Sequence, residues 1–138
     1  MLLKDISFVI PVYNRPNEID ELLKSFSRLE GDKDFEIVII EDGSTEKCDH
    51  IVKSFSDLNI SYHLKSNSGP GDSRNYGMSV AKGKYYVILD SDVILPVNYN
   101  VLLIENLINN FSDCFGGVDD SHQSFNNFQK AVSYSMTS

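Results

Sequence analysis

The sequence predicts an α/β fold with a mostly parallel, twisted sheet and helices on both faces. Apolar, strand-like runs alternate along the 138 residues with segments whose apolar residues recur at helical spacing. The run from Ile37 to Ile40 is unbroken, which is typical of a parallel strand covered on both faces. Strands that alternate with helices join through right-handed crossovers and build a parallel sheet. The 138 residues fit one domain and are enough to bury a genuine core.

Three strands and two helices are expected in the first half of the chain. Pro16 opens the first helix, with Asn17 as its N-cap, because an Asn side chain can accept a hydrogen bond from an N–H of the first turn. The second helix follows the turn at residues 41–45 and has Cys48 on its apolar face. The strands are expected at residues 6–12, 35–40 and 60–64.

The second half continues the alternation of helix and strand. Pro70 suits the first turn of a helix that runs to about Lys82, where Gly83 offers a C-cap. The apolar run Tyr85–Leu89 is expected to form a strand buried on both faces. The remaining expected elements are a helix introduced by Pro96 and Asn98, a short strand at residues 113–118 and a helix from Gln123.

The net charge of the chain argues against two classes of binding partner, nucleic acids and anionic membranes. Twelve basic residues stand against 20 acidic ones, which gives a net charge of −8. Neither a nucleic-acid interface nor an anionic-membrane patch is expected, because both need a cluster of Lys and Arg that the sequence lacks. No apolar run approaches the roughly 20 residues of a membrane span, and the first residues lack the pattern of a signal peptide. We expect a cytoplasmic protein, with peripheral association at the inner face of a membrane left open.

Polar residues follow the expected strands at the point where each strand ends. They are Tyr13–Arg15, Glu41–Gly43, Lys65–Asn67 and Asp90–Asp92. In parallel α/β sheets the carboxyl ends of the strands meet at one edge, and ligands bind beyond that edge. The sequence therefore predicts a binding site built from these four turns.

Two aspartates, Asp90 and Asp92, come directly after an apolar run. Residues i and i+2 of a strand point the same way, so both carboxylates can converge on one cation. Mg²⁺ or Mn²⁺ is commonly held by one or two carboxylates, with waters and substrate phosphates completing its coordination. The alternative is that one Asp caps the following turn while the other is solvated. The pair is thus a candidate metal site for a phosphate-containing ligand.

Asp42, Tyr13 and Arg74 each have a functional and a structural interpretation. Asp42 can accept a hydrogen bond from the N–H of a nucleobase, or it can form an Asx turn with the residues that follow. Tyr13 can stack on a base or be an ordinary half-buried aromatic residue. Arg74 can bind a phosphate or a base edge, or lie on the surface as most arginines do. The local patterns do not decide between the two interpretations.

Four segments taken together resemble the family 2 glycosyltransferases with the GT-A fold. They are residues 8–15, FVIPVYNR; residues 38–44, VIIEDGS; residues 67–77, NSGPGDSRNYG; and residues 86–92, YVILDSD. The match covers residues 5–110, with the segments in the order and spacing of the family.

The resemblance implies a nucleotide-diphosphate-sugar donor, often a UDP-sugar, with Mg²⁺ or Mn²⁺ as cofactor and a glycan or lipid-linked acceptor. It implies metal-dependent, inverting transfer, with residues 1–138 as the donor-binding, Rossmann-like half of a GT-A domain that is truncated at its C-terminus. By motif position, Tyr13 lies against the base, Asp42 contacts the base, and Arg74 lies near the base and the diphosphate. The implied donor-binding residues are Pro11, Tyr13, Arg15, Glu41, Asp42, Arg74, Asp90 and Ser91, and the implied metal ligands are Asp92 and Asp90.

One departure from the family concerns the general base. In an inverting enzyme of this kind a carboxylate well downstream of the DxD motif deprotonates the acceptor hydroxyl. Asp119 and Asp120 come too early for that motif, so we expect the base beyond Ser138 and expect the chain to be part of a longer transferase. Two alternatives remain, a non-catalytic nucleotide-sugar-binding module and a phosphatase of the haloacid dehalogenase type.

Overall fold

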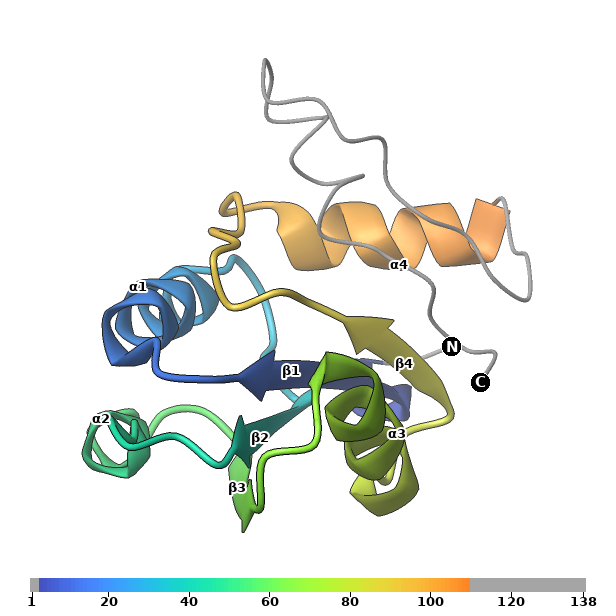
Figure 1. Ribbon diagram of the computed structural model, residues 1–138. Coiled ribbons are helices and arrows are strands. Elements are labelled where there is room, and N and C mark those ends of the chain that lie inside the picture. The colour runs from blue at the N-terminus through green and yellow to red at the C-terminus, as the bar shows by residue number, and fades with distance from the viewer. Residues whose placement is uncertain (1–2, 110–138) are drawn as a thin grey trace.

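The computed structural model describes residues 3–109, which form a four-stranded parallel sheet with helices on both faces (Figure 1). The strand order is β3-β2-β1-β4. The strands are β1 (Ile6–Val12), β2 (Glu36–Asp42), β3 (Ile60–Lys65) and β4 (Tyr85–Ile88), preceded by a 3₁₀ helix, η1 (Leu3–Asp5). The helices are α1 (Pro16–Ser27), α2 (Asp49–Lys53), α3 (Pro70–Val80) and α4 (Tyr99–Asn109). The predicted fold class is confirmed.

Alternate residues of each strand are buried against different helices. Helices α1 and α4 lie on one side of the sheet and α3 lies on the other (Figure 1). Phe8 and Ile10 of β1 belong to the larger core cluster, together with side chains of α1 and α4. Val9, between them, packs in a smaller cluster with Met78 and Val80 of α3. Successive strand residues point to opposite faces, so alternate residues of a strand pack against the helices on one face and on the other.

Phe8 is at the centre of the larger core cluster. Its ring centroid lies 5.0 Å from that of Phe26, 5.2 Å from that of Phe35 and 6.1 Å from that of Tyr99. All four side chains are fully buried. These rings join the central strand β1 to α1, to the start of β2 and to α4.

Helix α3 lies close against the sheet because Gly77 has no side chain. A Cβ added at this position would be 2.3 Å from Cγ1 of Val9, well inside van der Waals contact. The close approach fixes the height of α3 above β1 and β2. It thereby sets the position of Arg74, which lies one turn earlier on the same helix.

Two predicted helix ends differ from the structure. The N-cap of α1 is Arg15, not Asn17, because Pro16 takes the first helical position and places Asn17 inside the first turn. Helix α3 ends at Val80 with an extended residue as its C-cap, so Gly83 is not its cap. Gly83 instead lies against β1, where its N–H donates to Ser7 Oγ at 2.9 Å and an added Cβ would be 2.6 Å from the same oxygen.

Strand boundaries also differ from the prediction. β2 continues to Asp42, because Glu41 and Asp42 pair in register with the last two residues of β3. β4 ends at Ile88, and its first two residues are only half-buried, so the prediction of a strand buried on both faces was wrong there. Within residues 3–109, β4 is an edge strand that pairs with β1 alone, which explains the lower burial.

The second predicted helix is shorter than its apolar pattern indicated. Helix α2 has five residues, and Cys48 is its buried N-cap residue. The strand expected at residues 113–118 and the helix expected from Gln123 lie outside the described residues. Within residues 3–109, no helix is both long and apolar enough to cross a membrane.

Candidate functional site

Two of the predicted residues, Pro11 and Asp42, share the α3 side of the sheet at its carboxyl edge, and Asp90 follows the neighbouring strand β4. Asp42 accepts hydrogen bonds from the backbone that leads into α3. Pro11 lies opposite Ile40, whose side chain packs in the α3 cluster. The N–H of Leu89 donates to Val9 O at 3.0 Å, so the ladder continues one residue past β4 before Asp90. Ile88, the last residue of β4, packs in the α3 cluster, and Asp90 follows it by two residues in the turn beyond the strand.

Asp42 is the most firmly held of these residues. Its Oδ1 accepts from Lys65 Nζ at 2.6 Å and from Ser68 N at 2.9 Å, and its Oδ2 accepts from Gly69 N at 3.0 Å. Asn67 Nδ2 donates to Asp42 O at 2.9 Å and lies 3.5 Å from Oδ2. The residue is 4% exposed. Asp42 thus ties the end of β2 to the loop between β3 and α3.

The ionisation of Asp42 reflects this environment. Burial by itself raises the pKa of its carboxyl, but Lys65 Nζ and the N–H groups of Ser68 and Gly69 more than offset that effect. The pKa of Asp42 therefore lies below its ordinary value. The side chain is a charged, oriented acceptor at neutral pH.

The turn after Asp42 depends on a glycine. Gly43 has φ of 71°, a conformation that residues with a Cβ rarely adopt. A Cβ at this position would be 2.5 Å from the backbone N of Asn67. The loops that follow β2 and β3 can therefore touch only because residue 43 is glycine.

Glu41 lies on the other face of β2, away from Asp42. Its carboxylate is fully buried and accepts from Ser44 Oγ, from Cys48 N at 2.9 Å and from Tyr62 Oη at 2.7 Å. Burial, together with the negative charge of Glu41, raises the pKa of the Cys48 thiol, and burial and the bond to Glu41 raise the pKa of the Tyr62 phenol. The structure does not bring Glu41 to the α3 side, since neighbouring residues of a strand face opposite ways.

Asn14 closes the turn between β1 and α1 onto the turn after β2. It has φ of 52°, in the left-handed region that Asn tolerates better than most residues. Its Oδ1 accepts from Thr45 N and from Glu46 N, both at 2.9 Å, and its own N–H donates to Ser44 Oγ at 2.8 Å. Two of the polar turns at the carboxyl edge are therefore held together by one side chain.

Asn14 gives a testable prediction about stability. Asn14→Ala is expected to lower the free energy of unfolding by about 2 kcal/mol, because it removes an acceptor for two N–H groups and strains the left-handed backbone. Asn14→Asp keeps both the acceptor and the tolerated conformation and is expected to change stability by less than about 0.5 kcal/mol. Urea unfolding of both variants and of Asn14→Gly measures the difference. If the Gly variant is as stable as the wild type, the hydrogen bonds to Oδ1 contribute nothing.

The Asp90–Asp92 segment forms a turn and not an extension of β4. Val93 N donates to Asp90 O at 3.3 Å, and both aspartates are exposed. The sequence predicts convergence of the Asp90 and Asp92 carboxylates because they would lie on a strand, but β4 ends before them. Within residues 3–109, neither carboxylate accepts a hydrogen bond or forms an ion pair, unlike the carboxylates of Glu41 and Asp42. Two exposed carboxylates on one turn remain available to a ligand.

The donor set of this turn fits a divalent cation bound together with a phosphate ligand. Among the described residues there is no group of three or more His, Cys, Asp or Glu side chains arranged to hold a metal ion. Asp90 and Asp92 would therefore supply one or two oxygen ligands, and the others would come from water and from the ligand. This is the usual way in which Mg²⁺ is held at phosphate sites, and oxygen ligands suit Mn²⁺ as well.

The aromatic and basic candidates lie around the same edge. Tyr13 is 51% exposed, as a residue available for stacking must be. Arg74 is half-buried on α3. Arg15 is exposed on the α1 side, where its Nη1 donates to Asn14 O at 3.0 Å. Ser91 also lies on that side, because its Oγ donates to Glu18 of α1 at 2.7 Å.

Sequence reasoning missed four residues that shape this edge. Lys65 and Asn67 were noted as part of a polar turn, but their bonds to Asp42 depend on the pairing of β2 with β3. Asn14 lay inside a recognised motif, although nothing in that motif indicated its contact with Thr45. Glu18 gave no local signal, since it is an ordinary acidic residue in the first turn of a helix.

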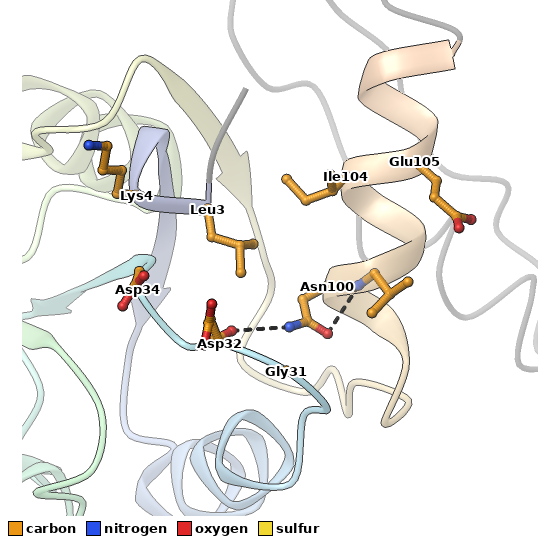
Figure 2. A pocket seen from close by; sticks show the side chains of 9 residues that line it. Leu3, Lys4, Gly31, Asp32, Asp34, Asn100, Ile104 and Glu105 are labelled. Carbon is orange, nitrogen blue, oxygen red and sulfur yellow. Dashed lines mark hydrogen bonds between the residues drawn. The ribbon is translucent and has the colours of Figure 1, made fainter.

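Two pockets lie at opposite ends of the sheet. One, of about 290 Å³, opens between the first turns of α1 and the turn at residues 91–94, and Asp92 lines it. A larger one, of about 530 Å³, is shown in Figure 2. It lies between η1, the segment before β2 and α4, where Asn100 Nδ2 donates to Asp32 O at 3.2 Å. None of the predicted site residues lines this larger pocket.

The chain is similar in sequence to glycosyltransferases. It matches the model of the family described as Glycosyl transferase family 2 over residues 7–136. It is 46% identical over 88 residues to the uncharacterized glycosyltransferase RC0461 of Rickettsia conorii. The aligned segment is 63% of this chain and 14% of that protein. It is 37% identical over 90 residues to the poly(ribitol-phosphate) beta-N-acetylglucosaminyltransferase TarS of Staphylococcus aureus. This aligned segment is 62% of this chain and 16% of TarS.

Solved structures show the same arrangement of strands and helices. The crystal structure of TarS 1-349 in complex with UDP-GlcNAc has a TM-score of 0.73 at 28% identity and covers 86% of this chain and 36% of that chain. The mannosyltransferase PcManGT from Pyrobaculum calidifontis, in complex with GDP-Man and Mn²⁺, has a TM-score of 0.75 at 20% identity and covers 89% and 38% of the two chains. The likeness to PcManGT is one of fold. By the match over residues 7–136, this chain belongs to glycosyl transferase family 2.

Proposed function

We propose that the chain binds a nucleotide-diphosphate-sugar together with a divalent cation, and that the protein to which it belongs transfers the sugar to a glycan or lipid-linked hydroxyl with inversion. The observation that carries this proposal is the turn Asp90–Asp92, which presents two exposed carboxylates at the carboxyl edge of a parallel sheet. Family membership supports the glycosyl transfer. The same family membership argues against the alternative of a haloacid-dehalogenase-type phosphatase.

Asp92 and Asp90 would hold the cation, which when bound neutralises the diphosphate and stabilises the charge that develops on the leaving group. Tyr13 would offer its exposed ring to the base, and Arg74 would pair with the base edge or a phosphate. Of the two Asp42 oxygens, Oδ2 has the weaker set of partners and is the one that we assign to a base N–H. A uridine base is favoured because the similar TarS structure holds UDP-GlcNAc.

The proposal is tested by calorimetry with the 138-residue chain. UDP is expected to bind in the presence of Mn²⁺ and much more weakly without it, and Asp92→Ala is expected to weaken the binding with Mn²⁺ at least about tenfold. Asp57→Ala is the matched control, because Asp57 is also exposed but precedes β3 at the opposite edge of the sheet. GDP and ADP titrations measure the base preference. Folded protein that binds no nucleoside diphosphate in a metal-dependent way would sink the proposal.

A further inference from the structure

Glu18 connects helix α1 to the turn that carries the two exposed aspartates. Ser91 Oγ donates to Glu18 Oε1 at 2.7 Å, across 73 positions of sequence. Both residues are half-buried, and both line the pocket of about 290 Å³ between α1 and the turn. A carboxylate acceptor makes this a charge-assisted hydrogen bond, which is stronger than a neutral one.

The turn has few other attachments among the described residues. On one side Leu89 N is bonded to Val9 O at 3.0 Å, and on the other Leu95 N is bonded to Ser25 Oγ at 3.1 Å. Between these anchors, within residues 3–109, the Ser91–Glu18 bond is the one hydrogen bond that joins the turn to another element. Without it, the carboxylates on either side of Ser91 would be free to reorient.

Glu18 is itself held in place near the turn between β1 and α1. Its Oε1 lies 3.9 Å from Arg15 Nε, and Arg15 Nη1 donates to Asn14 O at 3.0 Å. Arg15 and Glu18 are both partly exposed, so their ion pair adds little energy by itself. The contacts nevertheless form a continuous path from the Asn14 turn through Arg15 and Glu18 to Ser91.

We propose that Glu18 is a positioning residue for the metal site, which holds the Ser91 hydroxyl so that Asp90 and Asp92 are ordered before the cation binds. Groups that orient metal ligands commonly change metal affinity by 10- to 100-fold when they are removed. Ordering the turn in advance lowers the entropy lost on binding. The inference rests on the proposed function, because it assigns Glu18 a part in the same cation and diphosphate site.

The test separates metal-dependent from metal-independent binding. Glu18→Ala is expected to weaken UDP binding in the presence of Mn²⁺ about tenfold, while the weaker affinity for UDP without metal stays unchanged. Ser91→Ala is expected to cause the same loss of affinity in the presence of Mn²⁺, because it removes the same hydrogen bond. The double variant is expected to lose no more than either single variant, because both remove the same bond. Glu18→Gln keeps an acceptor oxygen at the same position and is expected to restore most of the affinity.

Glu21→Ala is the matched control for position and charge. Glu21 lies one turn after Glu18 and lines the same pocket, but its ion-pair contact is with Lys24 and not with the turn. Its substitution is expected to leave both affinities unchanged. Wild-type binding of Mn²⁺ and UDP by Glu18→Ala would overturn the inference, as would an equal loss with and without metal accompanied by a lower Tm. If the wild type shows no metal-dependent binding, the proposed function fails as well.

Discussion

Replacing Lys65 with methionine is expected to lower the free energy of unfolding by about 3 kcal/mol at neutral pH. Lys65 Nζ lies 2.6 Å from Asp42 Oδ1, and the two side chains are 14% and 6% exposed. Methionine fills a similar volume but leaves a buried carboxylate with only its backbone and amide donors. Removing one partner of a buried pair costs more than the pair contributes, because the remaining charge stays away from water.

The control is the same substitution at an exposed pair. Lys24 Nζ lies 2.9 Å from Asp20 Oδ2 on the surface of α1, where the side chains are 49% and 32% exposed. Lys24→Met is expected to cost far less than Lys65→Met, because an exposed pair at positions i and i+4 contributes little to stability. Chemical unfolding of both variants makes the comparison. Equal costs would show that burial of the Lys65–Asp42 pair has no energetic consequence.

The effect of Lys65→Met should also depend on pH. Because the pKa of Asp42 is lower in the folded protein than its ordinary value, its charge adds stability above the unfolded pKa of about 3.9. That stability is lost as the pH falls through the folded pKa. The difference between wild type and Lys65→Met is therefore expected to be constant near neutral pH and to shrink below about pH 4.

Phe8→Ala is expected to lower the free energy of unfolding by about 3–5 kcal/mol. Phe8 is fully buried, and its ring meets Phe26 and Phe35 edge-on at centroid distances of 5.0 and 5.2 Å. Removing the ring loses its burial and leaves a cavity at the point where β1, α1 and α4 meet. The rigid central strand makes full collapse of that cavity difficult.

The position of the ring is tested by two comparisons. Phe8→Leu keeps much of the apolar volume and is expected to cost clearly less than Phe8→Ala. Tyr13→Ala removes an aromatic side chain that is 51% exposed, and it is expected to change stability by less than about 0.5 kcal/mol. Thermal and urea unfolding measure all three. A small cost for Phe8→Ala, matching that of Tyr13→Ala, would contradict the assignment of Phe8 to the centre of the core.

Most of the fold could be predicted because burial leaves a direct pattern in the sequence. The strand at residues 6–12 was predicted with its observed bounds, since its apolar run stops at a polar turn. The extent of β2 could not be predicted from apolar pattern, because Glu41 and Asp42 continue the strand through pairing with β3. Helix α1 begins at Pro16 as predicted, but its N-cap was misassigned to Asn17, which lies inside the first turn. The end of α3 was misplaced because Gly83 lies against β1 and does not cap the helix.

The candidate site was predictable in location but not in its connections. The rule that ligands bind beyond the carboxyl ends of parallel strands places Asp42 and Asp90 at one edge from sequence alone. The separation of Glu41 from Asp42 required the strand to extend past residue 40, which its polar composition concealed. The Ser91–Glu18 bond depends on how α1 packs against the end of β4, and no spacing in the sequence encodes such a contact.

The opposite orientations of Glu41 and Asp42 have a consequence for insertions and deletions in β2. Deleting one residue upstream in this strand would move each later side chain to the other face of the sheet. The Glu41 carboxylate, which now accepts hydrogen bonds from Ser44, Cys48 and Tyr62, would then point toward α3. Asp42 would take its place, facing three donors with a side chain that is one methylene shorter. The length of β2 is thus as constrained as its composition, and changes in length are expected to be tolerated in the loop before residue 35 and not within the strand.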